Sequence, residues 1–482
     1  MMRRSVIALS VLLAGCSVGP DYKQPEVPVP PAFKELAGWK QSQPRDDIDR
    51  GAWWSVYHDP ELDRLERMVN ISNQTVKEYE AAYRNAVALV GEARASLFPT
   101  ATLSPGVTRG TSGGGSSSLG GGGRSSTIYS ITGTVAWDPD IWGKVRRQVE
   151  SNVAGAQVSA ADLANARLSA QATLATDYFD LRAEDALAQL LRETLAAYQH
   201  ALDITQNQYR AGTTSSAGYV TALAQLQSTR AQLVGVGVQR QQYEHAIAML
   251  TGHAPSEISI APAPTLPVAV PVVPPGLPSA LLERRPDIAA AERQMQQENA
   301  LIGVQVAAFY PDISLSALAG FEGNPLSSLF KVANRIWSLA ASGSATLFSG
   351  GARTASVAAA RATYDQYVAT YRQTVLTAFQ QVEDALSNLR ILELQAAAEA
   401  TAVESTRKAV EVTFNEYRAG TVAYTSVITE QTLLLADQQT ALSIQQSRLV
   451  ASVALIEALG GGWTTGALPA PAAVKKANPV FP

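Results

Sequence analysis

The chain has 482 residues, of which 17% are charged and 46% are hydrophobic. Because a typical soluble domain carries roughly 25% charged residues, small uncharged residues fill the difference, and these suit closely packed helices and membrane-facing strands. The formal net charge of −4 offers no basic face of the kind that nucleic-acid-binding proteins need, which excludes this class.

The first sixteen residues have the pattern of a bacterial lipoprotein signal peptide. Arg3 and Arg4 precede an apolar run, Ser5–Leu13, that is too short to span a bilayer. The motif Leu-Ala-Gly-Cys then ends at Cys16, the only cysteine in the chain. We expect residues 1–15 to be removed and Cys16 to carry a covalent lipid of more than one acyl chain.

The alternative for Cys16 is an inert cysteine inside a signal peptide that is cut elsewhere. Ser17 stands where lipoproteins of the inner membrane carry an aspartate. The sequence therefore predicts a lipid-anchored protein of the cell outer membrane that extends into the periplasm.

Residues 16–58 are predicted to form an extended tether that lies along the body. Six prolines forbid a long helix there, and Trp53 and Trp54 are interpreted as anchors that pack this segment. A helix is expected to begin at Pro60, with Asp59 as its N-cap, and to run to about Ser96.

Two pairs of alternating segments predict β-hairpins at 97–138 and 311–348. Leu103 and Val107 alternate with polar residues in the first pair, and the second pair runs from Ile313 to Leu347 in the same manner. Each strand has about ten residues, the length that crosses an outer membrane when tilted. Aromatic residues lie at the strand ends, as in the girdles of membrane barrels: Trp137, Trp142, Trp337 and Phe348.

Long helical hairpins are predicted after both β-hairpins. No proline occurs from about 144 to 208 or from about 351 to 415, and each stretch amounts to roughly 100 Å of helix. The pentapeptide Tyr-Arg-Ala-Gly-Thr ends both, at Tyr209–Thr213 and Tyr417–Thr421. Near the C-terminus, apolar residues recur every seven positions as in a coiled-coil seam: Ile428, Leu435, Leu442, Leu449 and Ile456.

The chain is therefore interpreted as one unit written twice. The first repeat covers 59–254 and the second 286–462, each with a helix, a β-hairpin and a long helical hairpin. A proline-rich connector, 255–285, joins them, and 463–482 is predicted to be a mobile tail.

Four membrane strands cannot close into a barrel alone, and an open edge in lipid leaves backbone groups unpaired at several kcal/mol each. Two copies would give eight strands, which side chains fill, whereas three give twelve strands around a lumen. The fold class expected is mostly α with a membrane β-barrel part that continues into a tube of helices.

Three motifs resemble the outer-membrane efflux protein (TolC-like) family, in its NodT-type lipoprotein branch. They are Gly-Pro-Asp-Tyr at 19–22, Trp-Trp at 53–54 with Asp-Pro-Glu-Leu-Asp at 59–63, and Leu-Leu-Glu-Arg-Arg-Pro-Asp-Ile at 281–288. The similarity covers essentially the whole mature chain, and the Arg-Arg-Pro-Asp-Ile block is its most specific part.

The resemblance implies a homotrimer with a twelve-stranded outer-membrane β-barrel and a long periplasmic α-helical barrel. Such trimers are the exit channels of tripartite efflux pumps and passively conduct drugs or other small molecules. Their partners are a periplasmic adaptor (membrane fusion) protein and an inner-membrane transporter of the resistance–nodulation–division type.

Both pentapeptide turns are candidate functional sites. Gly212 and Gly420 are predicted to take left-handed helix C-caps, and Thr213 and Thr421 to cap the helices that follow. In similar proteins these turns form the periplasmic tip, where the pore is shut at rest and the adaptor docks. The resemblance therefore assigns tip contacts to Tyr209, Arg210, Tyr417 and Arg418. A further hypothesis is that both arginines bond acidic or carbonyl partners between helices. Simple hairpin geometry is the competing interpretation, and it accounts for the glycines.

The sequence departs from the family in the acidic residues of the tip. Several relatives carry aspartates about six residues beyond the turn glycine, where this chain has Gly218 and Ser426. Asp203 and Glu411 are candidate gate acids instead, and the alternative for both is ordinary solvated helix surface.

The sequence shows no pattern of an enzyme, a metal site or a bound cofactor beyond the lipid on Cys16. The four histidines have no ligand spacing, and the glycine-rich stretch lacks the Lys-Ser/Thr ending of a phosphate loop. Two alternatives to efflux remain open: the outer-membrane conduit of a type I protein secretion system, and a non-conducting, periplasm-spanning structural lipoprotein.

Overall fold

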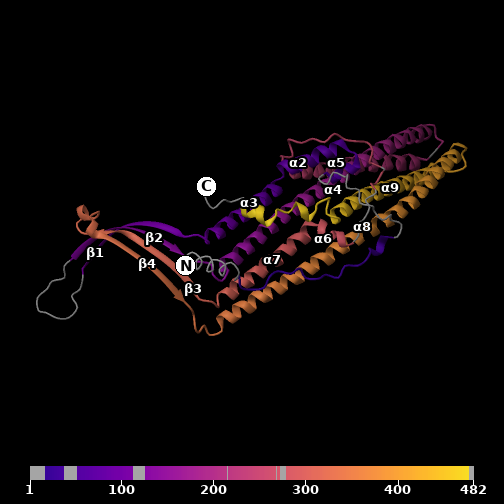
Figure 1. The fold of residues 1–482 in the computed structure, drawn as a ribbon. Coiled ribbons are helices and arrows are strands. Elements are labelled where there is room, and N and C mark those ends of the chain that lie inside the picture. The colour runs from indigo at the N-terminus through magenta and orange to yellow at the C-terminus, as the bar shows by residue number, and fades with distance from the viewer. Residues whose placement is uncertain are drawn as a thin grey trace.

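A computed structural model describes residues 17–36, 52–111, 125–213, 215–267, 269–271 and 278–476. The molecule is elongated, with a four-stranded sheet at one end and a layer of long helices extending away from it (Figure 1). Among the described helices, none is both long and apolar enough to cross a membrane.

The sheet consists of the two predicted hairpins side by side, in the order β1-β2-β3-β4 and antiparallel throughout. Its strands are β1 (Thr100–Thr111), β2 (Ser125–Trp137), β3 (Asp312–Gly323) and β4 (Arg335–Ser344). The predicted extension of the last strand to Leu347 is wrong. Ser344 pairs with Asp312, the first residue of β3, and the preceding Pro311 cannot donate a hydrogen bond that would continue the ladder.

Two helices of 67 residues each run from the sheet to the opposite end of the molecule: α4 (Lys144–Arg210) and α8 (Ala352–Arg418). Their N-caps, Gly143 and Gly351, have φ of 81° and 86°, a left-handed conformation that glycine adopts without strain. Helices α5 (Ser216–Leu250) and α9 (Tyr424–Ala458) return with 35 residues each. All these bounds are offset by 208 residues, which confirms the internal repeat.

The helix expected from Pro60 to Ser96 is broken, which corrects the prediction. It consists of α2 (Pro60–Ser72) and α3 (Gln74–Ala95). The Oδ1 atom of Asn73 accepts the N–H of Val76, and its Nδ2 donates to the carbonyl of Leu250, 2.7 Å away. Asn73 therefore caps the start of α3 at the point where α5 ends. Helices α5 and α3 together form one column with a joint at Asn73. The predicted start of α2 is confirmed, because Asp59 accepts from the N–H groups of Glu61 and Leu62.

The second repeat contains the same joint with different residues. Helix α7 (Pro286–Ala307) starts where α9 ends, and Arg285 Nη1 donates to the carbonyl of Ala458 at 2.9 Å. Arg285 also pairs with Asp287 at 2.6 Å. The specific Arg-Arg-Pro-Asp-Ile block thus holds a helix joint.

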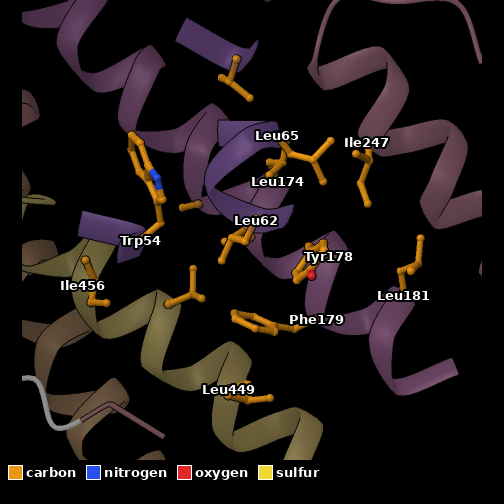
Figure 2. Close-up of a cluster of buried hydrophobic side chains, with 14 of the residues drawn as sticks. Trp54, Leu62, Leu65, Leu174, Tyr178, Phe179, Leu181, Ile247, Leu449 and Ile456 are labelled. Carbon is orange, nitrogen blue, oxygen red and sulfur yellow. The ribbon is translucent and has the colours of Figure 1, made fainter. Parts of the chain in front are cut away.

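The largest core lies where α2 packs on α4, α5 and α9 (Figure 2). Leu62, Leu174 and Phe179 are fully buried there. The predicted seam of α9 contributes Leu449 and Ile456 to the same cluster, which confirms it as packing.

The N-terminal segment lies along the body, as predicted for the described residues 17–36. Asn299 donates to the carbonyl of Pro20, Glu383 accepts from the backbone of Lys34, and Phe33 is buried. Farther on, Trp53 and Trp54 are buried in a short 3-10 helix, Trp53–Tyr57. They are anchors, as expected.

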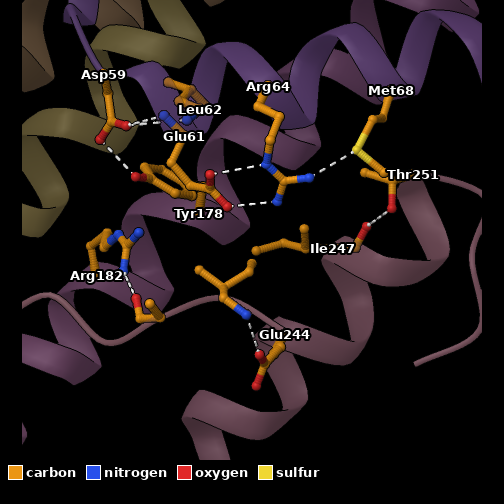
Figure 3. Close-up of polar contacts among 12 residues, drawn as sticks. Asp59, Glu61, Leu62, Arg64, Met68, Tyr178, Arg182, Glu244, Ile247 and Thr251 are labelled. Carbon is orange, nitrogen blue, oxygen red and sulfur yellow. Dashed lines mark hydrogen bonds and ion pairs between the residues drawn. The ribbon is translucent and has the colours of Figure 1, made fainter. Parts of the chain in front are cut away.

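A buried charge network holds the connector against α4 and α5. Asp185, whose side chain is 2% exposed, accepts from Arg240 Nε at 2.6 Å and from Arg182 Nη1 at 3.1 Å. Arg182 also donates to the carbonyl of Ala261, and Glu244 accepts the N–H of Ile260 (Figure 3). After the connector, a single helical turn, α6 (Leu281–Arg284), leads to the second repeat.

The predicted mobile tail is wrong for the described residues 463–476. They end in a short helix, α10 (Pro471–Lys476), whose Val474 is 1% exposed. Val474 packs against Val90 of α3 and Val149 and Val153 of α4. An isolated valine in an Ala/Pro segment gives no periodicity, so the sequence did not indicate this contact.

Candidate functional site

The two pentapeptide turns lie at the end of the helical layer farthest from the sheet, and we call this end the tip (Figure 1). Gly212 and Gly420 have φ of 71° and 76°, which confirms the predicted left-handed C-caps. The threonines, however, do not cap the following helices. The hydroxyls of Thr213 and Thr421 donate back to the carbonyls of Gln208 and Glu416 at 3.0 and 2.9 Å. These carbonyls lie in the last turn of a helix and lack partners within it, so the threonines cap the ends of the preceding helices.

Tyr417 connects the two helical hairpins of one chain. Its hydroxyl donates to Gln208 Oε1 of α4, 209 residues away along the chain. Its ring also lies 5.1 Å from the ring of Tyr424 at the start of α9. The tip contact predicted for Tyr417 is thus a bond between α8 and α4.

Tyr209 occupies the same pentapeptide position but makes a different contact. Its ring stacks on Tyr219 of α5, with the centroids 5.9 Å apart and the planes 8° from parallel. Tyr209 remains 46% exposed and stays within its own hairpin. The two repeats are therefore alike in backbone but not in side-chain contacts at the tip.

An apolar cluster lies behind Tyr417 and joins both hairpins. It includes Tyr198 and Leu202 of α4, Leu226 of α5 and Val427 of α9, with Tyr424 among its buried members. Burial raises the pKa of Tyr424 to about 12, so this phenol stays neutral at physiological pH. The cluster holds the hairpin ends together by apolar contact, and the Tyr417–Gln208 bond lies at its edge.

The charged candidates of the tip are exposed. Arg210 and Arg418 form no hydrogen bond or ion pair with any described residue of the chain, and both are solvent-accessible. Asp203 accepts a hydrogen bond from Gln199 at 2.9 Å on the same helix face, and Glu411 is exposed. A single chain does not bring these four groups together, so their roles as gate and docking residues stay predictions about an assembly.

Cys16, the predicted lipid attachment site, lies outside the described residues. The structure begins at Ser17, beside the junction of strands and helices. Val18 donates its N–H to the carbonyl of Trp142 between β2 and α4, 3.1 Å away. The first described residues therefore lie at the level where the strands meet the helices.

The segment after Val18 is held closely against the helices. Arg147 donates to the carbonyl of Gly19 and pairs with Asp21 at 2.8 Å. Gly19 has φ of 99°, and a Cβ atom there would lie 2.4 Å from the Cα atom of Gly303 on α7. Only glycine fits this contact, because a residue with a Cβ atom would be strained at this φ and would clash with Gly303.

The sequence missed Gln208, Tyr219 and Tyr424 as members of the tip. Tyr219 and Tyr424 each lie shortly after a pentapeptide, within reach of a helical hairpin, and this spacing could have indicated them. Gln208 carries no such signal, because its partner belongs to the other repeat. Among the described residues, no group of three or more His, Cys, Asp or Glu side chains could hold a metal ion.

Comparison with known proteins gives consistent matches along the chain. The family model described as outer membrane efflux protein matches residues 67–253 and 277–461. The chain is 29% identical to the probable efflux pump outer membrane protein TtgC of Pseudomonas putida, over 96% of both chains. It is 27% identical to the probable outer membrane lipoprotein SilC of Salmonella typhimurium, over 96% of this chain and all of SilC.

A solved structure of the outer-membrane channel OprN superposes with a TM-score of 0.86 at 28% identity, covering 93% of this chain and 100% of OprN. Both matched stretches of the family model coincide with the two repeats, so the shared feature is the duplicated helix–hairpin–helix unit rather than a local motif.

Proposed function

Because this chain belongs to the outer membrane efflux protein family, we propose that three copies of it form the exit channel of a tripartite efflux pump. The channel would span the cell outer membrane through its strands and the periplasm through its helices. It would conduct drugs or other small molecules passively, while an inner-membrane transporter of the resistance–nodulation–division type supplies the energy and a periplasmic adaptor joins the two.

The observation that carries this proposal is that the sheet and the helical layer are both open. Strands β1 and β4 lie at the two ends of the described sheet, each with one neighbour. In the tip half, α5 packs on α4, α4 on α9 and α9 on α8, so α5 and α8 are the outer helices. A subunit with matching open edges at both levels is suited to a ring in which each edge meets a neighbour.

Both outer helices carry exposed apolar side chains that a neighbouring copy would cover. Val220 and Val238 of α5 are 56% and 57% exposed, and Leu394 and Val412 of α8 are 68% and 48% exposed. Each pair is separated by 18 residues, five helical turns, and therefore lies on one face. Such stripes at opposite edges favour head-to-tail contact between copies over a two-fold dimer.

Three copies account for a lumen, since twelve strands enclose one and eight do not. The position of Ser17 at the start of the sheet supports acylation of Cys16, because the lipid would enter the same bilayer as the strands. SilC, described as a lipoprotein, is similar over its full length. No catalytic step is part of this function, and no cofactor beyond the lipid is proposed.

The test uses purified full-length protein reconstituted in planar bilayers. We expect a trimeric mass and discrete conductance steps, and a deletion strain that becomes drug-sensitive and recovers when the gene is restored. A monomer that passes no current would refute the channel and support the structural lipoprotein. Unchanged drug susceptibility together with lost export of a protein substrate would support type I secretion instead.

A further inference from the structure

The end of the sheet farthest from the helices carries three cations beside exposed apolar side chains. Arg109 lies near the end of β1, Lys331 in the turn between β3 and β4, and Arg335 at the start of β4. All three are exposed. We call them, together with Phe330 and Trp337, the rim surface.

Both arginines lie on the apolar face of the sheet. Along β1, Arg109 alternates in phase with Leu103 and Val107, which are 70% and 67% exposed. On β4, Arg335 is in phase with Trp337, which is 69% exposed. The register confirms a common face, because Arg335 pairs with Phe321, Phe321 with Ile131 and Ile131 with Pro105, all in phase with Leu103.

The turn between β3 and β4 folds over the same face. The ring of Phe330 lies edge-on against Phe321, with the centroids 5.5 Å apart. Phe330 nevertheless remains 69% exposed, and Val332 beside Lys331 is 79% exposed. The turn therefore places Lys331 between apolar side chains on the face that would contact lipid.

The charge of the rim surface is not compensated by the described residues. Lys331 bonds to Ser328 and Asn334 through its backbone alone, and none of the three side chains forms an ion pair or a hydrogen bond with a described residue. The nearest carboxylate along the strands, that of Glu322, is out of phase with Phe321 and lies on the opposite face. Uncompensated cations next to apolar and aromatic side chains complement a ligand that carries both phosphate and acyl chains.

We propose that the rim surface binds the phosphate groups of a phosphorylated glycolipid in the outer leaflet of the membrane. Arg109, Lys331 and Arg335 pair with the phosphates, while Trp337 and Phe330 contact the acyl chains and the sugar. The inference rests on the proposed function. If the helices lie in the periplasm, the opposite end of the sheet lies in the outer leaflet of the membrane.

The experiment is a binding titration of the delipidated, detergent-solubilised full-length protein with three lipids. These are bis-phosphorylated lipid A, lipid A after phosphatase treatment, and phosphatidylglycerol. We expect the wild type to bind the first most tightly and the combined variant R109S/K331S/R335S to bind it about a hundred-fold more weakly, roughly five-fold for each cation. The matched control K23S/K77S/R84S removes one exposed cation from the N-terminal segment and two from α3, and we expect its affinity to stay within about two-fold of the wild type.

Several results would overturn the inference. These are unchanged binding by the rim variant, an equal loss in the control, or equal affinity for phosphatase-treated lipid A or phosphatidylglycerol. Should the combined variant fail to assemble, K331S alone tests the same contact, since Lys331 lies in an exposed turn, and a five-fold loss is expected. Conductance of each preparation separates the two proposals: a conducting wild type without lipid A binding refutes only the rim surface, whereas a protein that never conducts refutes the channel.

Discussion

Replacing Tyr417 by Phe should favour separation of the two helical hairpins at the tip. The hydroxyl of Tyr417 donates to Gln208 Oε1 and links α8 to α4, while the ring packs on Tyr424 and Phe414. Phenylalanine keeps the ring contacts and removes only the hydrogen bond. The substitution therefore tests a single contact between the repeats.

The magnitude follows from the value of one hydrogen bond, about 1 kcal/mol net. This shifts the equilibrium between joined and separated hairpins by about five-fold in each subunit. If the three subunits of the proposed trimer separate together, the effects add to about 3 kcal/mol, or more than a hundred-fold in the open population.

The assay is single-channel recording of wild type and variant in planar bilayers, with susceptibility of whole cells to a large antibiotic as a second readout. We expect a higher open probability for Tyr417→Phe and greater sensitivity of the cells. Tyr209→Phe is the matched control, because Tyr209 has the same pentapeptide position and its ring stacks on Tyr219 within one hairpin. Equal behaviour of the two variants would refute the assignment of the bond to tip closure.

Three further predictions concern stability. Asp185→Ala leaves the buried Arg182 without a carboxylate, whereas Arg240 keeps its ion pair with Glu244. We expect a cost of about 3–5 kcal/mol in denaturant unfolding. Glu393→Ala, at the equivalent exposed position of the second repeat, should change stability by less than about 0.5 kcal/mol, and similar losses would contradict the buried network. Glu66 is fully buried with both carboxylate oxygens unpartnered, and burial, with a smaller effect of Asp63, raises its pKa well above the usual value. The neutral carboxyl group therefore contributes its full stability below about pH 4.5, and this stability is lost as the pH rises through the raised pKa. Glu66→Gln, which stays neutral, should melt at a higher temperature than the wild type at pH 8 but not at pH 4. Melting temperatures that differ by the same amount at both pH values would disprove this. Val474→Asp places a charge in an apolar contact and should release α10, seen as faster proteolysis of the C-terminal segment; an unchanged digestion rate would argue against the packed tail.

Much of the fold could be predicted because the repeat is expressed in local signals. Gly143 and Gly351 mark the starts of the 67-residue helices, and the pentapeptides mark their ends. The strands could be predicted from the alternation of apolar and polar residues, because successive side chains point to opposite faces of a sheet. These features depend on near neighbours in the chain, which a sequence displays directly.

What could not be predicted depends on segments that are distant in the chain. Asn73 has the residue type of a cap, but the break it makes depends on the carbonyl of Leu250. Asp185 and Glu393 are equivalent in the repeat, yet only Asp185 is buried, because the connector covers it. At the tip, the backbone of both turns was predicted, whereas the Tyr417–Gln208 bond was not, because it joins the two halves of the chain.

The joints at Asn73 and Arg285 make the four columns of a subunit mechanically unequal. Helices α4 and α8 are continuous, so turning one end of either rod stores strain along its whole backbone. The columns α5–α3 and α9–α7 are interrupted. At each break a side chain, Asn73 or Arg285, donates a hydrogen bond to the carbonyl of the last residue of the adjoining helix. We expect twist applied to α5 or α9 at the tip to be taken up partly at that break, whereas the continuous helices α4 and α8 pass it on to the strands.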